Sequence, residues 1–243
     1  MIECPSPNHD ARAGGRRPDM LILHYTGMRD ADAALARLVD PGSAVSAHYL
    51  IGEDGTAHRL VAEERRAWHA GVSIWEGERD INSRSIGIEL VNPGHEFGYR
   101  SFPEAQIARL IALVHDILGR HAISPFHVLG HSDVAPERKS DPGELFPWEV
   151  LAAEGIGLLP NAGAPGSLSP LATDASGRAV AALKEHLAAF GYAPPPGPDY
   201  DAGTRAVVTA FQRHYRRHLV TGVADRETVA ILEALVRMKE KLS

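Results

Sequence analysis

The chain has 243 residues and a formal net charge of -6, with 44% hydrophobic and 23% charged residues. This composition is typical of a folded globular protein with one full domain and a smaller one, and the acidic balance argues against a nucleic-acid partner. Because Cys4 is the single cysteine, an intrachain disulfide and a thiol-rich zinc site are excluded, so any metal must be held by His, Asp or Glu.

The N-terminal segment MIECPSPNHD has neither the basic nor the apolar part of a signal peptide. No apolar run approaches the length of about 18 residues that a membrane span requires. We therefore expect no membrane span and a cytoplasmic protein. The alternative is a periplasmic protein whose N-terminus has been trimmed, with Cys4 as its lipidation site.

The first two thirds of the chain alternate between strand and helix patterns. In chain order we expect strands at 20–26, within 46–61, at 85–91 and at 127–130, and helices at 30–40, 101–121 and 147–155. The Asp54-Gly55 pair predicts a hairpin turn within 46–61. Ser101 and Glu104 predict a capping box at the start of the longest helix. Strands flanked by helices indicate an α/β fold with a mixed central β-sheet.

The last third of the chain has a different character. Residues 157–173 are rich in Gly, Pro, Ser and Ala, which predicts a linker. Three helical segments follow, and the pattern Asp-x-x-Thr at Asp201 and Asp225 predicts capped starts for the second and third helices. We therefore expect an α/β domain over 1–156 and a small all-α three-helix domain over 174–243.

Two of the thirteen histidines lie at the ends of apolar strands. These are His24, after Met-Leu-Ile-Leu, and His131, after His-Val-Leu-Gly; a buried imidazole is costly unless it has a partner. Asp141 follows between a serine and a proline. Two histidines and a carboxylate, with a fourth position open, are the ligand set of a hydrolytic zinc site. The alternative is two core histidines bonded to backbone groups, and sequence spacing by itself does not bring these side chains together.

Two further ionisable residues are candidates for chemistry. Glu89 lies within an apolar strand, where carboxylates are rare unless paired. It is either an edge-strand residue that faces water or a general base near the metal. Lys139 is two residues before Asp141, so in an extended segment both side chains point to the same face. Lys139 is either an ion-pair partner or a group that stabilises a developing oxyanion.

Four motifs, LILHYTG, RRAWHAGVS, SIGIELVNPG and GHSDVAPERKSDPGELFPW, occur in this order over roughly residues 5–155. They resemble the zinc-dependent N-acetylmuramoyl-L-alanine amidases, in particular the AmpD-like branch, whose fold is shared with peptidoglycan recognition proteins and T7-type lysozyme. The segments LKEHLAAFGY, DAGTRAVVTAFQ and ADRETVAIL resemble the three-helix peptidoglycan-binding domain. The resemblance implies that 1–156 is a zinc amidase catalytic domain.

The resemblance also implies roles for single residues. Zn²⁺ would be held by His24, His131 and Asp141, while Glu89 would assist the attacking water and Lys139 would stabilise the oxyanion. The residues expected to line the substrate groove are Trp68, His69 and Ala70, with Tyr49 and Asn82 as further candidates.

The implied reaction is hydrolysis of the amide between N-acetylmuramic, or anhydro-N-acetylmuramic, acid and L-alanine. A cytoplasmic enzyme would meet soluble anhydromuramyl peptides during muropeptide recycling, whereas a wall-binding domain argues for polymeric peptidoglycan. The alternative function is a non-catalytic peptidoglycan-binding protein, against which the complete ligand set argues. The sequence does not indicate an oligomeric state.

Overall fold

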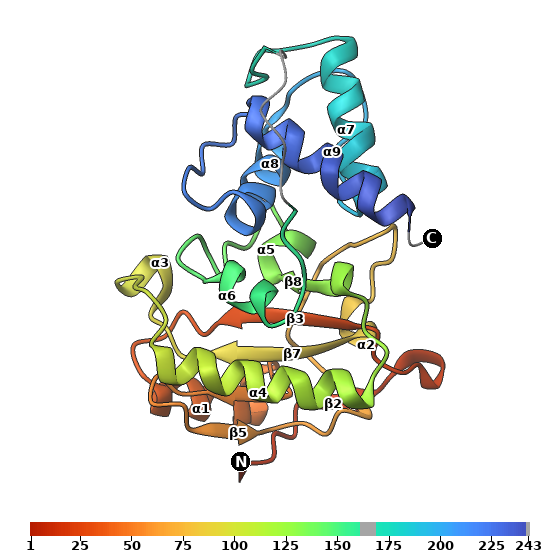
Figure 1. The fold of residues 1–243 in the computed structure, drawn as a ribbon. Helices are drawn as coiled ribbons and strands as arrows, with labels where there is room; N and C mark the ends of the chain where they lie inside the picture. The colour runs from red at the N-terminus through yellow and green to blue at the C-terminus, as the bar shows by residue number, and fades with distance from the viewer. Residues whose placement is uncertain (161–168, 242–243) are drawn as a thin grey trace.

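The computed structural model describes residues 1–160 and 169–241, so part of the expected linker, 161–168, lies outside the described residues. Its centre is a six-stranded sheet in the order β1-β5-β4-β7-β3-β8 (Figure 1). The strands of this sheet are Ile2–Glu3 (β1), Met20–Tyr25 (β3), Tyr49–Ile51 (β4), Ala57–Arg59 (β5), Ser85–Leu90 (β7) and Val128–Gly130 (β8). β3 pairs in parallel with both β7 and β8, and β4 pairs antiparallel with β5. A second, two-stranded sheet pairs His9–Ala11 (β2) with Arg65–Ala67 (β6).

One set of helices flanks the sheet, and a second set follows it in the C-terminal part of the chain. The α/β part contains Ala31–Val39 (α1), Ile81–Arg84 (α2), Gly94–Phe97 (α3), Glu104–Arg120 (α4), His131–Val134 (α5) and Trp148–Ala153 (α6), with short 3-10 turns at Ala13–Gly15, Pro41–Ser43 and Pro125–His127. The C-terminal helices are Arg178–Phe190 (α7), Ala202–Tyr215 (α8) and Arg226–Glu240 (α9). The predicted fold class, a mixed sheet with flanking helices followed by a helical region, is confirmed. None of the helices among the described residues is both long enough and apolar enough for a bilayer crossing.

The expected starts of the helices are confirmed in two cases and wrong in one. Asp201 and Asp225 each accept a hydrogen bond from a backbone N–H in the first turn of α8 and α9, as their spacing predicts. The capping box at Ser101 and Glu104 is wrong, because α4 begins only at Glu104 and none of the described side chains caps it. Pro103 has extended backbone angles, which leave Ser101 too early in the chain to reach the first helical N–H groups.

The two faces of the sheet pack against different layers. On β3, Leu21 and Leu23 belong to the same hydrophobic cluster as α4, whereas Met20 and Ile22 belong to a cluster that includes α7, α8 and α9. In Figure 1 these C-terminal helices lie on the side of β3 away from α4. Because strand side chains alternate between faces, His24 points to the side of Met20 and Ile22, away from α4.

A buried polar contact also joins the helical region to the α/β part. The carboxylate of Asp133, in α5, accepts hydrogen bonds from the hydroxyl of Tyr192 and from Nδ1 of His214, the latter at 2.8 Å. The ring of His214 stacks on Trp148 with centroids 3.7 Å apart. The helical region is therefore packed directly against the helix that begins at His131. The expected domain boundaries stay a prediction.

We expect the whole chain to unfold in one cooperative transition, because one hydrophobic cluster spans both parts. Trp75 is fully buried there and contacts Phe190 and Tyr192 edge-on. Trp75→Ala should lower the free energy of unfolding by about 3–5 kcal/mol, measured by denaturant titration. Val72→Ala, at a residue that is 83% exposed, should change it by less than about 0.5 kcal/mol. Two separate calorimetric transitions in the unmodified protein would contradict the prediction that the whole chain unfolds in one cooperative transition.

Candidate metal centre

Three side chains that are far apart in the sequence converge near the carboxyl ends of β3 and β8. His24 lies near the end of β3, His131 begins α5 directly after β8, and Asp141 lies in the loop that follows. All three are buried, with exposed fractions of 1%, 2% and 5%. The Nδ1 atoms of the two histidines are 2.9 Å apart, and each lies 3.0 Å from Oδ2 of Asp141. The three expected ligands therefore meet at one point.

This triangle of atoms fits one face of a tetrahedral metal site. With metal–ligand bonds of about 2.0–2.2 Å, ligand atoms around tetrahedral zinc lie roughly 3.3–3.5 Å apart. Nε2 of His131 lies 3.0 Å from the carbonyl oxygen of Ala70, which can only accept, so this nitrogen carries the proton and Nδ1 presents a lone pair. Two imidazoles and one carboxylate that present such lone pairs to each other suit a divalent cation, and the residues present fit zinc.

The electrostatics of the centre favour the deprotonated ligands that a metal needs. Burial, together with the neighbouring His131, lowers the pKa of His24 to about 4. Burial acts to raise the pKa of Asp141, but the imidazoles of His131 and His24 outweigh it and hold this pKa well below its usual range. Burial and the nearby His24 also lower the pKa of His69 well below its ordinary value. At neutral pH the centre thus offers an anionic carboxylate beside a neutral His24.

Glu89 lies directly beside the ligands. It is the register partner of His24 in the β3–β7 pairing, and β7 is an interior strand, so the edge-strand alternative is wrong. Oε2 of Glu89 is buried and has no hydrogen-bond partner among the described residues. Burial, and then the charge of Asp141, raise the pKa of Glu89 well above its ordinary value, while Lys139 acts in the opposite direction. Glu89 as a whole is half-buried and lines the groove described next, so its carboxyl group can be reached from that groove.

A groove of about 900 Å³ opens over these residues. Glu89, Lys139, His131 and Asp141 line it, together with residues of α1 and α3. Trp68 also lines it, so the groove leads from the candidate metal ligands to an aromatic side chain. The arrangement can hold an extended ligand with one of its bonds next to the three converging side chains, the carboxyl group of Glu89 and the ammonium group of Lys139.

The expected groove residues separate into two groups. Trp68 and His69 line the groove, whereas the other three expected residues are not among its described lining, namely Ala70, Tyr49 and Asn82. Tyr49 belongs to the α4-facing cluster, and its hydroxyl donates to Glu63 at 2.7 Å. Oδ1 of Asn82 accepts from the backbone N–H groups of His69 and Ala70, at 3.1 and 2.8 Å. Asn82 and Ala70 thus lie behind the candidate metal ligands, where they hold the segment that contacts His131.

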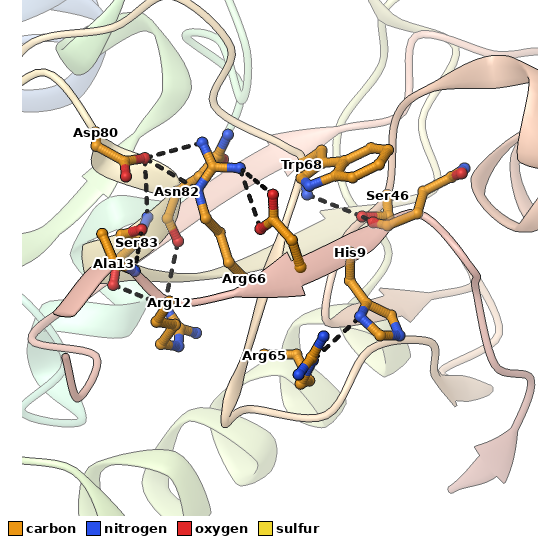
Figure 2. A network of polar contacts seen from close by, with 12 residues as sticks. His9, Arg12, Ala13, Ser46, Arg65, Arg66, Trp68, Asp80, Asn82 and Ser83 are labelled. Atoms are coloured by element: carbon orange, nitrogen blue, oxygen red, sulfur yellow. Dashed lines mark hydrogen bonds and ion pairs between the residues drawn. The ribbon is translucent and has the colours of Figure 1, made fainter. Parts of the chain in front are cut away.

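A polar network holds the segment that leads to His69, as Figure 2 shows. Arg66, on β6, donates to Asp80 at 2.9 Å, and the N–H of Trp68 donates to Oγ of Ser46, also at 2.9 Å. Arg12 is 5% exposed and donates to two backbone carbonyls of α2. The segment is thus held from several sides at the point where Trp68 lines the groove.

The sequence reasoning missed Arg138. Its Nη2 atom donates to the carbonyl oxygens of Ala70 and Val72, at 2.8 Å each, and lies 3.5 Å from Nε2 of His131. It therefore ties the loop that carries Lys139 to the segment behind the ligands. Its one signal in the sequence was its position directly before Lys139.

Two family models match the chain. Residues 14–144 match the family described as N-acetylmuramoyl-L-alanine amidase, and residues 176–232 match the family described as a peptidoglycan binding domain. The chain is 41% identical to N-acetylmuramoyl-L-alanine amidase AmiD of Escherichia coli strain K12, covering 93% of this chain and 85% of that protein. It is 35% identical to 1,6-anhydro-N-acetylmuramyl-L-alanine amidase AmpD of Enterobacter cloacae, covering 61% of this chain and 87% of that protein.

Solved structures show the same similarity. The complex of Escherichia coli AmiD with anhydro-N-acetylmuramic acid-L-Ala-D-gamma-Glu-L-Lys matches with a TM-score of 0.77 at 39% identity, covering 94% of this chain and 92% of that one. AmpDh3 from Pseudomonas aeruginosa matches with a TM-score of 0.79 at 36% identity, covering 94% of both chains. A further structure of AmpDh3 contains an anhydromuramic pentapeptide.

Proposed function

The chain belongs to the N-acetylmuramoyl-L-alanine amidase family, and we propose that it holds a zinc ion at His24, His131 and Asp141 to hydrolyse anhydromuramyl peptides. The family follows from the match over residues 14–144 and from 41% identity across 85% of AmiD. The protein is therefore a hydrolase that cleaves the amide between muramic acid and L-alanine, and the alternative of a non-catalytic binding protein is set aside. The convergence of the three ligand atoms beside Glu89 is the observation that carries the zinc proposal.

Zinc at this site would supply Lewis acidity, which lowers the pKa of water toward about 7 and polarises a carbonyl group. The carboxylate of Glu89 would take a proton from the attacking water and later deliver one to the departing amine of L-alanine. Its buried, unpartnered Oε2 atom supports this role, since no described protein group competes for it. A raised pKa suits a group that must both accept and donate a proton.

Lys139 would stabilise negative charge on the substrate. Its side chain lines the groove with Glu89 and Asp141. As the lactyl carbonyl becomes tetrahedral, its oxygen gains charge, which a nearby ammonium group stabilises more strongly than it stabilises the neutral carbonyl.

Lys139→Ala should lower kcat by roughly 10²–10³-fold, because one oxyanion-stabilising group is lost. Zinc content should stay at the level of the unmodified protein, since Lys139 is not a ligand. Steady-state kinetics with an anhydromuramyl tripeptide and metal analysis of the same sample check this result. Lys139→Arg keeps the charge and should recover part of the loss. An unchanged kcat in Lys139→Ala would remove this residue from the mechanism.

The reaction itself is tested by mass spectrometry of products from two substrates, an anhydromuramyl tripeptide and intact sacculi. We expect release of free peptide that begins with L-alanine, loss of this product after treatment with a chelator, and recovery on adding zinc. Cleavage at another bond, or cleavage that a chelator does not affect, would contradict the proposal.

The helical region is proposed to hold peptidoglycan and so to raise the local substrate concentration. The family match over residues 176–232 supports this role. Its alternative is a helical cap without a ligand, which the buried contact of Asp133 with Tyr192 and His214 favours. A preference for sacculi over the soluble tripeptide would support wall binding, and a preference for the tripeptide would support the cap.

The preference for sacculi or for the soluble tripeptide also bears on the cellular compartment in which the enzyme works. We propose a cytoplasmic enzyme of muropeptide recycling if the soluble tripeptide is the better substrate. A periplasmic enzyme that acts on the cell wall is the alternative, and the match to a peptidoglycan binding domain supports it. Fractionation of the source cells, with detection of the protein in each fraction, distinguishes the two.

A further inference from the structure

Behind the metal ligands lies a row of buried polar groups that the reaction does not use. Nε2 of His24 lies 3.0 Å from Nδ1 of His69, and Nε2 of His69 lies 3.2 Å from Oγ of Ser85. Oγ of Ser85 lies 2.6 Å from the backbone carbonyl oxygen of Ile81. The exposed fractions of His24, His69 and Ser85 are 1%, 8% and 0%, so these groups must satisfy one another.

The backbone carbonyl of Ile81, at the far end of this row, determines which group donates each hydrogen bond. The carbonyl of Ile81 can only accept, so the hydroxyl of Ser85 uses its one proton there. Oγ of Ser85 can then only accept, which makes Nε2 of His69 the donor. A neutral imidazole has a single N–H, so Nδ1 of His69 must accept, and Nε2 of His24 must carry the proton that it receives. Nδ1 of His24 is left with a lone pair that faces His131 and Asp141.

The other histidine ligand is held in the same tautomer by the next residue of the same segment. The carbonyl oxygen of Ala70 accepts from Nε2 of His131 at 3.0 Å. Oδ1 of Asn82 accepts from the N–H groups of both His69 and Ala70, which fixes the two groups relative to each other. Two consecutive residues of the motif AWHAG thus orient both imidazole ligands.

The ring of His69 has little freedom to turn away from this position. A Cβ atom added at Gly87, on β7, would lie 2.4 Å from Cγ of His69, so the ring packs directly against the strand backbone. Only glycine leaves this space, and Gly87 lies two residues before Glu89 on the same face of β7. The close contact fixes the ring plane and so directs its Nδ1 atom to His24.

We propose that His69 is a positioning residue that, together with Ser85, holds His24 in the tautomer whose Nδ1 atom binds the metal. This inference rests on the zinc site proposed above. Partners of metal-bound histidines typically contribute about 10–100-fold to metal affinity, because they fix both the tautomer and the orientation of the ring. His69 would act in this way without touching the substrate's reacting atoms.

The test compares His69→Leu with His69→Asn. Leucine fills a similar volume and offers no acceptor, whereas Oδ1 of asparagine can take the place of Nδ1 and accept from His24. We expect zinc affinity, measured by competition with a chelating dye, to fall about 10–100-fold in His69→Leu and to stay within a few fold of the unmodified protein in His69→Asn. Ring ¹⁵N–¹H correlation spectra should show His24 as the Nε2–H tautomer in the unmodified protein and in His69→Asn only.

The matched control is His48→Leu, which removes a second imidazole that is 0% exposed and lies on the same side of the sheet. Nδ1 of His48 accepts from the N–H of Gly87, and the ring lies edge-on to His69 with centroids 5.7 Å apart. Among the described residues it makes no hydrogen bond to His24, His131 or Asp141. We expect His48→Leu to lower stability without changing zinc affinity by more than a few fold. Equal losses of affinity in His48→Leu and His69→Leu would overturn the proposal, because general destabilisation would then explain both.

Ser85→Ala decides the question if His69→Leu does not fold. Without the acceptor at Oγ, Nε2 of His69 loses its partner, and both tautomers of His69 become accessible. We expect weaker zinc binding, by about 10-fold, and a mixture of tautomers at His24. Unchanged affinity and a single His24 tautomer in Ser85→Ala would overturn the proposal. Failure of the unmodified protein to bind zinc would instead contradict the proposed function, which keeps the two hypotheses separable.

Discussion

Replacing Asp141 by alanine should leave a protein without stoichiometric zinc and with amidase turnover at background. Asp141 supplies the one negative charge among the three converging ligand atoms. Without it, two neutral imidazoles remain, and the charge of the cation is no longer balanced within a buried site. We expect zinc affinity to fall by more than the roughly 10–100-fold effect of a supporting residue. Elemental analysis after gel filtration should give one zinc per chain before the change and almost none after it.

The matched control for this change is Glu137→Ala, which removes an exposed carboxylate from the same loop. Zinc content and turnover should not change in this variant, because Glu137 lies outside the converging cluster. One zinc per chain in purified Asp141→Ala would show that the ligand assignment is incorrect.

Glu89→Gln should lower kcat by roughly 10²–10⁴-fold while the protein keeps its zinc and its stability. The amide has the shape of the carboxyl group but cannot take a proton from water. Since Oε2 of Glu89 is buried without a partner among the described residues, the loss of its charge removes a desolvation cost. The melting temperature should therefore stay the same or rise, which separates a chemical role from a structural one.

Turnover, zinc content and melting temperature of Glu89→Gln should be measured beside Glu96→Gln. Glu96 lines the same groove and is exposed, so this control makes the same change of charge away from the ligands. We expect its kcat to stay within a few fold of the unmodified protein. Turnover of Glu89→Gln that equals this control would exclude Glu89 as the general base.

Local patterns were sufficient for much of the fold. β3, β7, α4 and the C-terminal helices follow from periodicity over enough residues to distinguish a period of 3.6 from a period of 2. Strands of two or three residues, such as β1, β2 and β6, carry no such signal and were not predicted. The start of α4 was misplaced because a serine before a proline offers a capping pattern that the extended backbone of Pro103 does not allow.

The sequence by itself determined the chemical types of the candidate ligands and of the candidate base, and their order, since three of the four motifs carry His24, Glu89, His131 and Asp141. Only the tertiary structure decided which atoms meet. The pairing of β3 with β7 sets Glu89 beside His24, and the same alternation turns Tyr49 to the opposite face. These placements depend on strand register, which is a property of two segments and not of either one.

His69 is the clearest example of a role that depends on tertiary contacts and could not be predicted from the sequence. A motif identified this residue as important, but its neighbours are His24, 45 residues earlier, and Ser85, 16 residues later. The direction of each hydrogen bond between them follows from a backbone carbonyl at the end of the row. Sequence patterns report local backbone preference and burial, whereas the protonated nitrogen of a buried imidazole is set by the partners that folding brings to it.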